Sequence, residues 1–381
     1  MIIIKIKLRF YLLLVSICVN IGFLGFFKYY NFFVENFITA FSFFGYQLGS
    51  STLNIILPVG ISFYTFQTLS YTIDIYRDKI KPQKHLGIFA VYVSFFPQLV
   101  AGPIERASNL LPQILKKRNF NFNQAVHGFR LVMWGLFKKV VIADNLAPSV
   151  DEIFSNYTAY PSHILLMGAV FFAFQIYCDF SGYSDIARGL AKFLGLELMV
   201  NFNFPYFSRS IAEFWRKWHI SLSTWFRDYL YIPLGGSRGS TAKKVRNTFI
   251  IFVISGFWHG ANWTFIAWGF LNALYFMPLL LLKKNRINIG IIGENRFPNL
   301  KDLLGMFFTF FITIIAWIFF RAENINEAIN IINKILFFDS GENLQISILI
   351  VLVLFTFILI EWFGRRDKFA IQNLFKNNPL L

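Results

Sequence analysis

His259 is the side chain whose surroundings in this sequence most strongly indicate chemistry. It lies within residues 247–282, which contain no Asp, Glu, Lys or Arg, between Arg246 and Lys283. A helix from Arg246 to His259 would be about 18 Å long, which reaches the middle of a hydrocarbon core of about 30 Å. An ionisable side chain at that depth is costly and indicates a functional site with a polar cavity around it. Because imidazole titrates near neutral pH, His259 could exchange a proton with a substrate.

A second histidine, His219, lies in a predicted helix that precedes this stretch. Ser210 and Glu213 have the spacing of a capping box, which predicts a helix beginning near Ile211. At about 100° per residue the apolar side chains form one arc and the polar ones fill the rest. The arc holds Phe214, Trp215, Trp218, Leu222, Trp225, Phe226 and Tyr229, and the other face holds Glu213, Arg216, Lys217, Ser221, Thr224, Arg227 and Asp228. The pattern predicts a helix lying flat at a membrane surface, with His219 at the edge of the arc, where it can face a cleft.

The segment that carries His259 is too long to be one straight span. Residues 247–282 would form a helix of roughly 54 Å, against about 30 Å of hydrocarbon. The segment must therefore tilt, break or turn back. Gly256, Gly260 and Asn262 are the expected points of weakness, and they lie on either side of His259.

The composition indicates a polytopic membrane protein. The sequence is 56% hydrophobic, 20% aromatic and only 15% charged, which a soluble protein would not tolerate. The net charge of +16 comes from Lys and Arg clusters beside the apolar runs, which indicates positive-inside topology and contact with anionic headgroups, and no nucleic-acid binding. Cys18 and Cys178 predict no disulfide framework. The five histidines contain no pair with metal-ligand spacing, so no metal site is expected.

About nine membrane spans are predicted, in a single all-α domain covering residues 1–381. Apolar runs occupy residues 8–27, 32–44, 53–72, 86–100, 127–147, 163–177, 247–282, 303–320 and 346–363. Pro58 and Gly60 predict a kink or a break in the third run. Residues 324–337 are apolar on one face and predict a short surface helix. The absence of an internal repeat disfavours the duplicated architecture of many transporters.

Carboxylates beside the apolar runs admit two interpretations. Asp179 and Asp185, in CDFSGYSDIARGL, could be acid–base groups or could bind a cation. Alternatively, Asp179 caps the following helix and Asp185 pairs with Arg188. Glu105 and Arg106 follow another apolar run, and such a pair is more often an interfacial salt bridge than a catalytic pair.

Four segments together resemble the membrane-bound O-acyltransferase family, and within it the bacterial branch typified by the alginate O-acetylation membrane protein. They are LPVGISFYTFQTLSYTIDIYR (57–77), SFFPQLVAGPIERASNLLPQI (94–114), YCDFSGYSDIARGLAKFLGLELMVNFNFPYFSRSIAEFWRKWHISLSTWFRDYLYIPLGGSR (177–238) and GFWHGANWTFIAWG (256–269). The family core in this sequence is residues 57–275. Family members usually have two or three further spans before the segment matching residues 28–33, where this sequence has one span from Leu8.

The resemblance implies a ring of membrane helices, with re-entrant and interfacial helices, around a tunnel. It implies transfer of an acyl group, usually acetyl, to hydroxyls of an envelope polysaccharide. His259 in FWHGAN matches the invariant family histidine, and His219 in FWRKWHIS matches a second functional histidine. Trp218, Trp258, Asn262, Asp179, Asp185, Arg216 and Asp228 become candidate substrate-binding residues. The resemblance further implies acetyl-CoA as donor, no tightly bound cofactor, a periplasmic acetyltransferase partner and a multi-pass position in the cell inner membrane.

Acyl transfer from a thioester to a hydroxyl needs a base and donors for the oxyanion. We expect His259 to take the hydroxyl proton and His219 to orient a substrate, with Asn262 or the N–H groups around Gly256–Gly260 as oxyanion donors. An acyl-enzyme formed on Ser221 or Ser255 is less favoured. The alternatives are a polysaccharide or lipid-sugar transporter, the same fold acting on peptidoglycan or transferring D-alanine to teichoic acid, and an inactive scaffold of an export complex.

Overall fold

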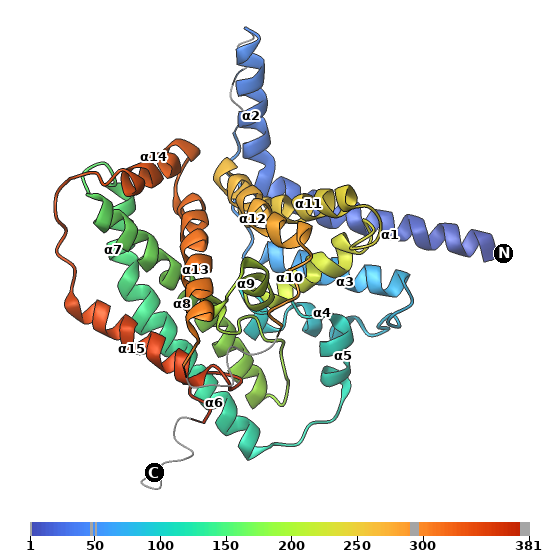
Figure 1. Ribbon diagram of the computed structural model, residues 1–381. Helices are drawn as coiled ribbons and strands as arrows, with labels where there is room; N and C mark the ends of the chain where they lie inside the picture. The colour runs from blue at the N-terminus through green and yellow to red at the C-terminus, as the bar shows by residue number, and fades with distance from the viewer. Residues whose placement is uncertain (1, 46–48, 50–51, 290–296, 374–381) are drawn as a thin grey trace.

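The computed structural model describes residues 2–45, 49, 52–289 and 297–373, and within those ranges it contains helices and no β-strand (Figure 1). The all-α fold class is therefore confirmed. The helices are α1 (Ile2–Leu24), α2 (Tyr30–Phe43), α3 (Ile61–Tyr76), α4 (Leu86–Val93), α5 (Ala107–Leu115), α6 (Phe122–Leu136), α7 (Asp144–Ser155), α8 (Ser162–Phe193), α9 (Ile211–Lys217), α10 (Ile220–Phe226), α11 (Thr241–His259), α12 (Trp263–Leu281), α13 (Leu300–Arg321), α14 (Ile325–Leu336) and α15 (Ile348–Gly364).

Four helical runs in the described ranges are long and apolar enough to cross a membrane. They are Lys7–Phe43, Ser162–Phe193, Trp263–Leu281 and Leu300–Arg321, and Leu86–Gln98 and Ile348–Gly364 are shorter apolar helices. A polytopic membrane protein is thus confirmed. Fewer helices meet this criterion than the nine spans predicted, because several predicted runs are joined to their neighbours or interrupted.

The first two predicted spans are joined by a helical turn. A π-helical turn, Gly25–Tyr29, connects α1 directly to α2, and the chain changes direction there (Figure 1). The next helix, α3, packs against α1 through the Ser16–Thr72 hydroxyl pair at 3.1 Å. It begins only after Gly60, whose φ of 76° is left-handed, so the third predicted run is broken rather than kinked.

The longest helix, α8, is continuous through both aspartates of the CDFSGYSD segment. The interpretation of Asp179 as the cap of a following helix is therefore wrong, because no helix begins there. Asp179 instead lies in the middle of α8, one face of which packs against α6. The helix ends at Phe193 in a glycine C-cap, where Gly195 has a left-handed φ of 72° and the Leu196 N–H donates to the Ala191 carbonyl at 2.9 Å.

The predicted break beside His259 is confirmed. Helix α11 ends at His259, and α12 begins at Trp263 after Asn262 accepts a hydrogen bond from the Thr264 N–H at 3.0 Å. The two helices pack closely because small residues face each other, as in many membrane helix pairs. A Cβ added to Gly256 would lie 2.2 Å from the Phe265 carbonyl oxygen, so no side chain fits there.

The predicted single amphipathic helix from Ile211 is wrong, although its start is right. Ser210 caps α9 by accepting a hydrogen bond from the Glu213 N–H at 3.3 Å. The helix then stops at Lys217, and α10 begins at Ile220 after His219 adopts a left-handed φ of 42°. Periodicity cannot reveal such a break because the apolar pattern continues through it.

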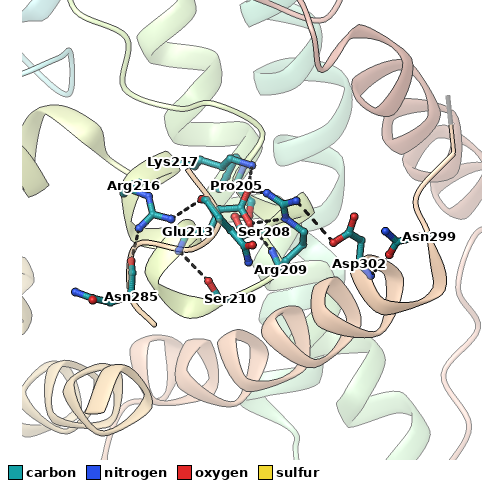
Figure 2. Close-up of polar contacts among 11 residues, drawn as sticks. Pro205, Ser208, Arg209, Ser210, Glu213, Arg216, Lys217, Asn285, Asn299 and Asp302 are labelled. Carbon is teal, nitrogen blue, oxygen red and sulfur yellow. Dashed lines mark hydrogen bonds and ion pairs between the residues drawn. The ribbon is translucent and has the colours of Figure 1, made fainter. Parts of the chain in front are cut away.

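A polar cluster holds α9 against the neighbouring helices (Figure 2). Glu213 lies on the predicted polar face, yet it is buried and forms ion pairs with Arg209 at 3.0 Å and Lys217 at 2.8 Å. Arg209 also lies 3.7 Å from Asp302 in the first turn of α13. Arg216 donates to the Asn285 carbonyl at 2.8 Å, which ties α9 to the segment after α12.

Candidate active site

A cavity of about 490 Å³ brings the two predicted catalytic histidines together. Its wall is formed by parts of the chain that are far apart in sequence, and the described residues that line it are Lys28, Ser62, Phe63, Val100, Ala101, Lys139, Ile176, Asp179, Phe180, Tyr183, Ile186, Trp218, His219, Trp258, His259, Trp317 and Phe320. Most of these side chains are apolar or aromatic. The few that can donate, accept or carry charge therefore decide what the cavity can bind.

The backbone around His219 is held in its left-handed conformation by the segment that precedes α9. The Ile220 N–H donates to the Asn201 carbonyl at 2.9 Å, and the Asn203 N–H donates to the Lys217 carbonyl at 3.0 Å. A left-handed φ costs a non-glycine residue of order 1–3 kcal/mol and persists where neighbouring contacts impose it, often at functional sites. These two hydrogen bonds impose it here, and they direct the His219 ring into the cavity wall.

The His219 ring is buried, with only 1% of the residue exposed. Its Nδ1 lies 3.2 Å from the Asn201 Oδ1, and its Nε2 has no hydrogen-bond partner. The edge of Phe180 packs against the ring at a centroid distance of 4.6 Å. One ring nitrogen is therefore fixed by the protein and the other is left for a cavity ligand.

His259 occupies the last position of α11, where the helix opens onto the cavity. Its ring packs edge-on among Trp268, Phe320 and Trp258, with centroid distances of 5.2, 5.1 and 5.0 Å. In the described ranges neither ring nitrogen has a protein hydrogen-bond partner. Trp258 lies near both histidines, since its ring centroid is also 6.2 Å from that of His219.

Two of the remaining predicted binding residues line the cavity with Trp258. Trp218 contributes its indole, and Asp179 contributes a carboxylate that pairs with Lys139 at 2.6 Å. Asp185 does not line it: its carboxylate is buried against Lys138 at 2.7 Å and Arg188 at 2.9 Å. The predicted Asp185–Arg188 pair is thus present, with a second cation added.

The other three predicted binding residues lie outside the cavity lining. Arg216 binds the loop after α12, and Asp228 pairs with Arg227 at 2.7 Å. Asn262 uses its oxygen to cap α12 and its amide to donate to the Glu323 carbonyl at 2.8 Å. Their hydrogen bonds serve the fold, so we assign none of them to the cavity.

Neither predicted nucleophilic serine lines the histidine cavity. The Ser221 hydroxyl donates to the Asn201 Oδ1 at 2.7 Å and accepts from the Ile104 N–H at 3.0 Å, and the residue is fully buried. Ser255 lines a separate cavity of about 280 Å³. The arrangement therefore brings two imidazoles, and no serine hydroxyl of these two, to the shared space.

The Glu105–Arg106 salt bridge expected from the sequence is not present. The Glu105 carboxylate accepts from Asn109 at 2.7 Å and from the Met199 N–H, while the Arg106 guanidinium lies 5.0 Å from the Tyr229 ring centroid. Adjacent side chains on extended backbone point in opposite directions, which separates this pair.

Sequence reasoning missed Asn201 and Lys28. Nothing local marks Asn201, because its partner lies eighteen positions away. Lys28 had a visible signal, because it is the only charged residue between Arg9 and Glu35 in an apolar run. Among the residues that the structure describes, no group of three His, Cys, Asp or Glu could hold a metal ion.

A second cavity of similar volume, about 480 Å³, lies between α8, α13 and α15. Its lining is aromatic and aliphatic, with Glu361 as its carboxylate, and that carboxylate already accepts from the Tyr177 hydroxyl at 2.9 Å. No histidine lines it. The histidine cavity is the better candidate for acid–base chemistry.

Comparison with known proteins identifies the family. Residues 85–321 match the model of MBOAT, the membrane-bound O-acyltransferase family. The chain is similar to a probable alginate O-acetylase AlgI of Pseudomonas aeruginosa, at 39% identity over 97% of this chain and 68% of that protein. It is also similar to a peptidoglycan O-acetyltransferase of Helicobacter pylori, at 38% identity over 84% of this chain and 63% of that protein. A teichoic acid D-alanyltransferase of Streptococcus thermophilus is 28% identical over 71% of this chain and 70% of its own length. The chain therefore belongs to the membrane-bound O-acyltransferase family and is a membrane O-acyltransferase.

Proposed function

We propose that this enzyme transfers an acetyl group from a cytoplasmic thioester, acetyl-CoA, to hydroxyls of an envelope polysaccharide of the alginate type. The observation that carries the proposal is the single cavity lined by both His219 and His259. Its volume of about 490 Å³ is sufficient for a thioester end and one sugar unit. The similarity to alginate O-acetylases supports the acetyl group and the polymer.

In the proposed reaction His259 acts as the general base. It takes the proton of the acceptor hydroxyl as the oxygen attacks the thioester carbonyl, and it returns that proton to the departing thiolate. Its ring nitrogens have no protein partner in the described ranges, so they are available to the substrate. His219 orients the acceptor: its Nε2 has no protein partner, and its other nitrogen is held by Asn201.

Direct transfer is favoured over an acyl-enzyme. A serine nucleophile must reach both a base and the thioester carbonyl. The Ser221 hydroxyl is instead engaged with Asn201 and Ile104, and Ser255 lines a different cavity. A single displacement needs only the two histidines and a group that stabilises the oxyanion.

Peptidoglycan is the second candidate acceptor. The peptidoglycan O-acetyltransferase of Helicobacter pylori is nearly as similar to this chain as the alginate O-acetylase is, at 38% against 39% identity. The teichoic acid D-alanyltransferase is less similar, at 28%. We further propose that the enzyme is located in the inner membrane and has a periplasmic acetyltransferase as its partner.

The test compares O-acetyl content of the envelope in cells that carry the wild-type gene, no gene, or one variant. Mild alkali releases ester-bound acetate from extracted polysaccharide and, in a separate fraction, from peptidoglycan. His259→Ala should abolish gene-dependent acetate release at normal membrane levels of the protein. The matched control is His163→Ala, because His163 is exposed at the start of α8.

The outcomes separate the candidates. Acetate lost from polysaccharide supports the proposal, acetate lost from peptidoglycan alone supports the second acceptor, and D-alanine released in place of acetate rejects acetyl transfer. Full acetylation in the His259→Ala strain would remove His259 from the chemistry.

A further inference from the structure

Lys28 is an ammonium group on the wall of the histidine cavity and within a membrane-spanning run. It belongs to Lys7–Phe43 and lies in the π-helical turn Gly25–Tyr29. A π-turn costs regular helical hydrogen bonding and occurs frequently at functional sites. A cation inside a membrane span is expensive and needs a partner that compensates its charge.

The protein partners of Lys28 are all neutral. Its Nζ donates to the Ser62 hydroxyl at 3.1 Å and also to the Trp258 carbonyl. The same nitrogen lies 5.4 Å from the Trp258 ring centroid. No described carboxylate lies within ion-pair distance of this nitrogen. Because an ammonium has three N–H donors, these two hydrogen bonds leave one for a ligand in the cavity.

Lys139, the other lysine that lines the cavity, differs from Lys28 because it has carboxylate partners. The Lys139 ammonium pairs with Asp144 at 2.7 Å and with Asp179 at 2.6 Å, so its charge is compensated by the protein. Lys28 therefore provides the uncompensated positive charge in the described lining of this cavity. It binds the carbonyl of the residue that immediately precedes His259, which brings the ammonium to the end of α11 that carries the proposed base.

We propose that Lys28 is a catalytic residue that stabilises the oxyanion of the tetrahedral intermediate. This inference rests on the proposed acyl transfer. The acceptor hydroxyl gives its proton to His259 while its oxygen bonds to the thioester carbon. The carbonyl π electrons move to the carbonyl oxygen, and the Lys28 ammonium donates a hydrogen bond to that oxyanion. The electron pair then returns, the carbon–sulfur bond breaks, and the thiolate takes the proton from His259.

A purely structural explanation must also be tested, because helix C-termini attract donors and cations. Tyr29 provides the matched control, since its hydroxyl donates to the Phe257 carbonyl at 2.9 Å at the same helix end and carries no charge. Tyr29→Phe removes a donor from the end of α11 and leaves the cation in the cavity. Lys28→Met removes the cation with little change in side-chain length, and Lys28→Arg retains it.

The experiment uses the full chain in proteoliposomes, with acetyl-CoA as donor and oligomannuronate as acceptor, and measures thiol release. Lys28→Met should lower kcat by about 10²- to 10³-fold, the usual effect of losing one oxyanion donor, with KM for acetyl-CoA changed by less than about threefold. Lys28→Arg should recover a substantial part of kcat. Tyr29→Phe should lower thermal stability and leave kcat near the wild-type value.

Three results would overturn the inference. The first is a kcat for Lys28→Met within about threefold of wild type. The second is a rise in KM for acetyl-CoA in Lys28→Met with kcat unchanged, which indicates contact with the phosphates of the donor. The third is a loss of kcat in Tyr29→Phe equal to that in Lys28→Met. If Lys28→Met does not reach the membrane, the Lys28→Arg variant tests the inference instead. A kcat of Lys28→Arg below about 1% of wild type would then contradict a role for the positive charge. Wild-type protein without acceptor-dependent thiol release would instead contradict the proposed function itself.

Discussion

The side-chain oxygen of Asn201 lies 3.2 Å from the Nδ1 of His219, and it also accepts the Ser221 N–H at 3.2 Å. A backbone N–H can only donate, so the Asn201 atom that faces it must be the oxygen. The Asn201 amide nitrogen meanwhile donates to the Ser184 hydroxyl at 3.2 Å. The Nδ1 of His219 must therefore carry a proton, which leaves the Nε2 lone pair directed to the cavity.

Changing Asn201 should alter how activity depends on pH. Asn201→Asp keeps the acceptor for Nδ1 but adds a negative charge, which favours imidazolium and should shift the acidic limb of the kcat profile upward by about 1–3 pH units. Asn201→Leu removes the acceptor and should lower kcat by about 10²-fold through misorientation. Thiol release from acetyl-CoA between pH 5 and 9 measures both. Identical profiles in wild type and Asn201→Asp would show that His219 does not titrate between pH 5 and 9 in the reaction.

Sequence reasoning found His219 and His259 but not the link that orients the first of them. The prediction that His259 lies deep in the membrane came from charge spacing alone, and the break predicted at Gly260 and Asn262 is present. The break at His219 could not be predicted, because it depends on two backbone hydrogen bonds to residues far away in the sequence. The Ile220 N–H donates to the Asn201 carbonyl, and the Asn203 N–H donates to the Lys217 carbonyl. Periodicity shows which residues of a helix are apolar. It does not show where a segment far away in the sequence forms backbone hydrogen bonds that interrupt the helix.

Three of the candidate binding residues, Arg216, Asp228 and Asn262, lie outside the cavity lining for a related physical reason. Arg216 and Asp228 lie on the predicted polar face, but polarity on a helix does not distinguish contact with a ligand from contact with the protein. Asn262 was chosen as a candidate because it lies near His259 in the sequence. At that same position its side chain caps α12. The first N–H groups of a helix have no partner within the helix, and the Asn262 side chain accepts a hydrogen bond from one of them.

Asp179 and Asp185 should respond differently to loss of charge. Asp185 is buried with two cations, so Asp185→Asn should destabilise the protein by about 3–5 kcal/mol, the range for breaking a buried ion pair. Asp179 is half exposed and lines the cavity, so Asp179→Asn should change KM or kcat with little loss of stability. Thermal midpoints in detergent and thiol-release kinetics check the two expectations. Equal stability losses would show that both carboxylates are structural.

The contact between α11 and α12 leaves no room for a side chain at Gly256. The nearest atom to an added Cβ is the Phe265 carbonyl oxygen, at 2.2 Å, and backbone cannot move aside as a flexible side chain can. Gly256→Val should therefore prevent correct assembly, with loss of the monodisperse peak in fluorescence-detected size-exclusion chromatography. Gly87→Val is the control, because nothing lies within 4 Å of its Cβ position. A normal elution profile for Gly256→Val would mean that the hairpin is looser than the structure indicates.

The ion pairs around Glu213 should make the stability of the fold depend on pH in the acidic range (Figure 2). Burial raises the pKa of this carboxyl, but the Arg209 hydrogen bonds and the Lys217 charge outweigh that effect and hold the pKa below its usual 4.5. Because the pKa is depressed in the folded state, ionised Glu213 stabilises the fold above about pH 4.5, and this contribution is lost as the pH falls further.

Glu213→Gln should remove that contribution. The glutamine retains an acceptor, but it removes the carboxylate charge that pairs with Lys217 and, together with Asp302, with Arg209, so the thermal midpoint in detergent should fall by several degrees at pH 7. The difference between wild type and Glu213→Gln should then narrow as the pH is lowered below 4.5. Thermal unfolding followed by tryptophan fluorescence across this pH range measures it. A constant difference at every pH would mean that the carboxylate stabilises α9 through shape and hydrogen bonding, with no contribution from its charge.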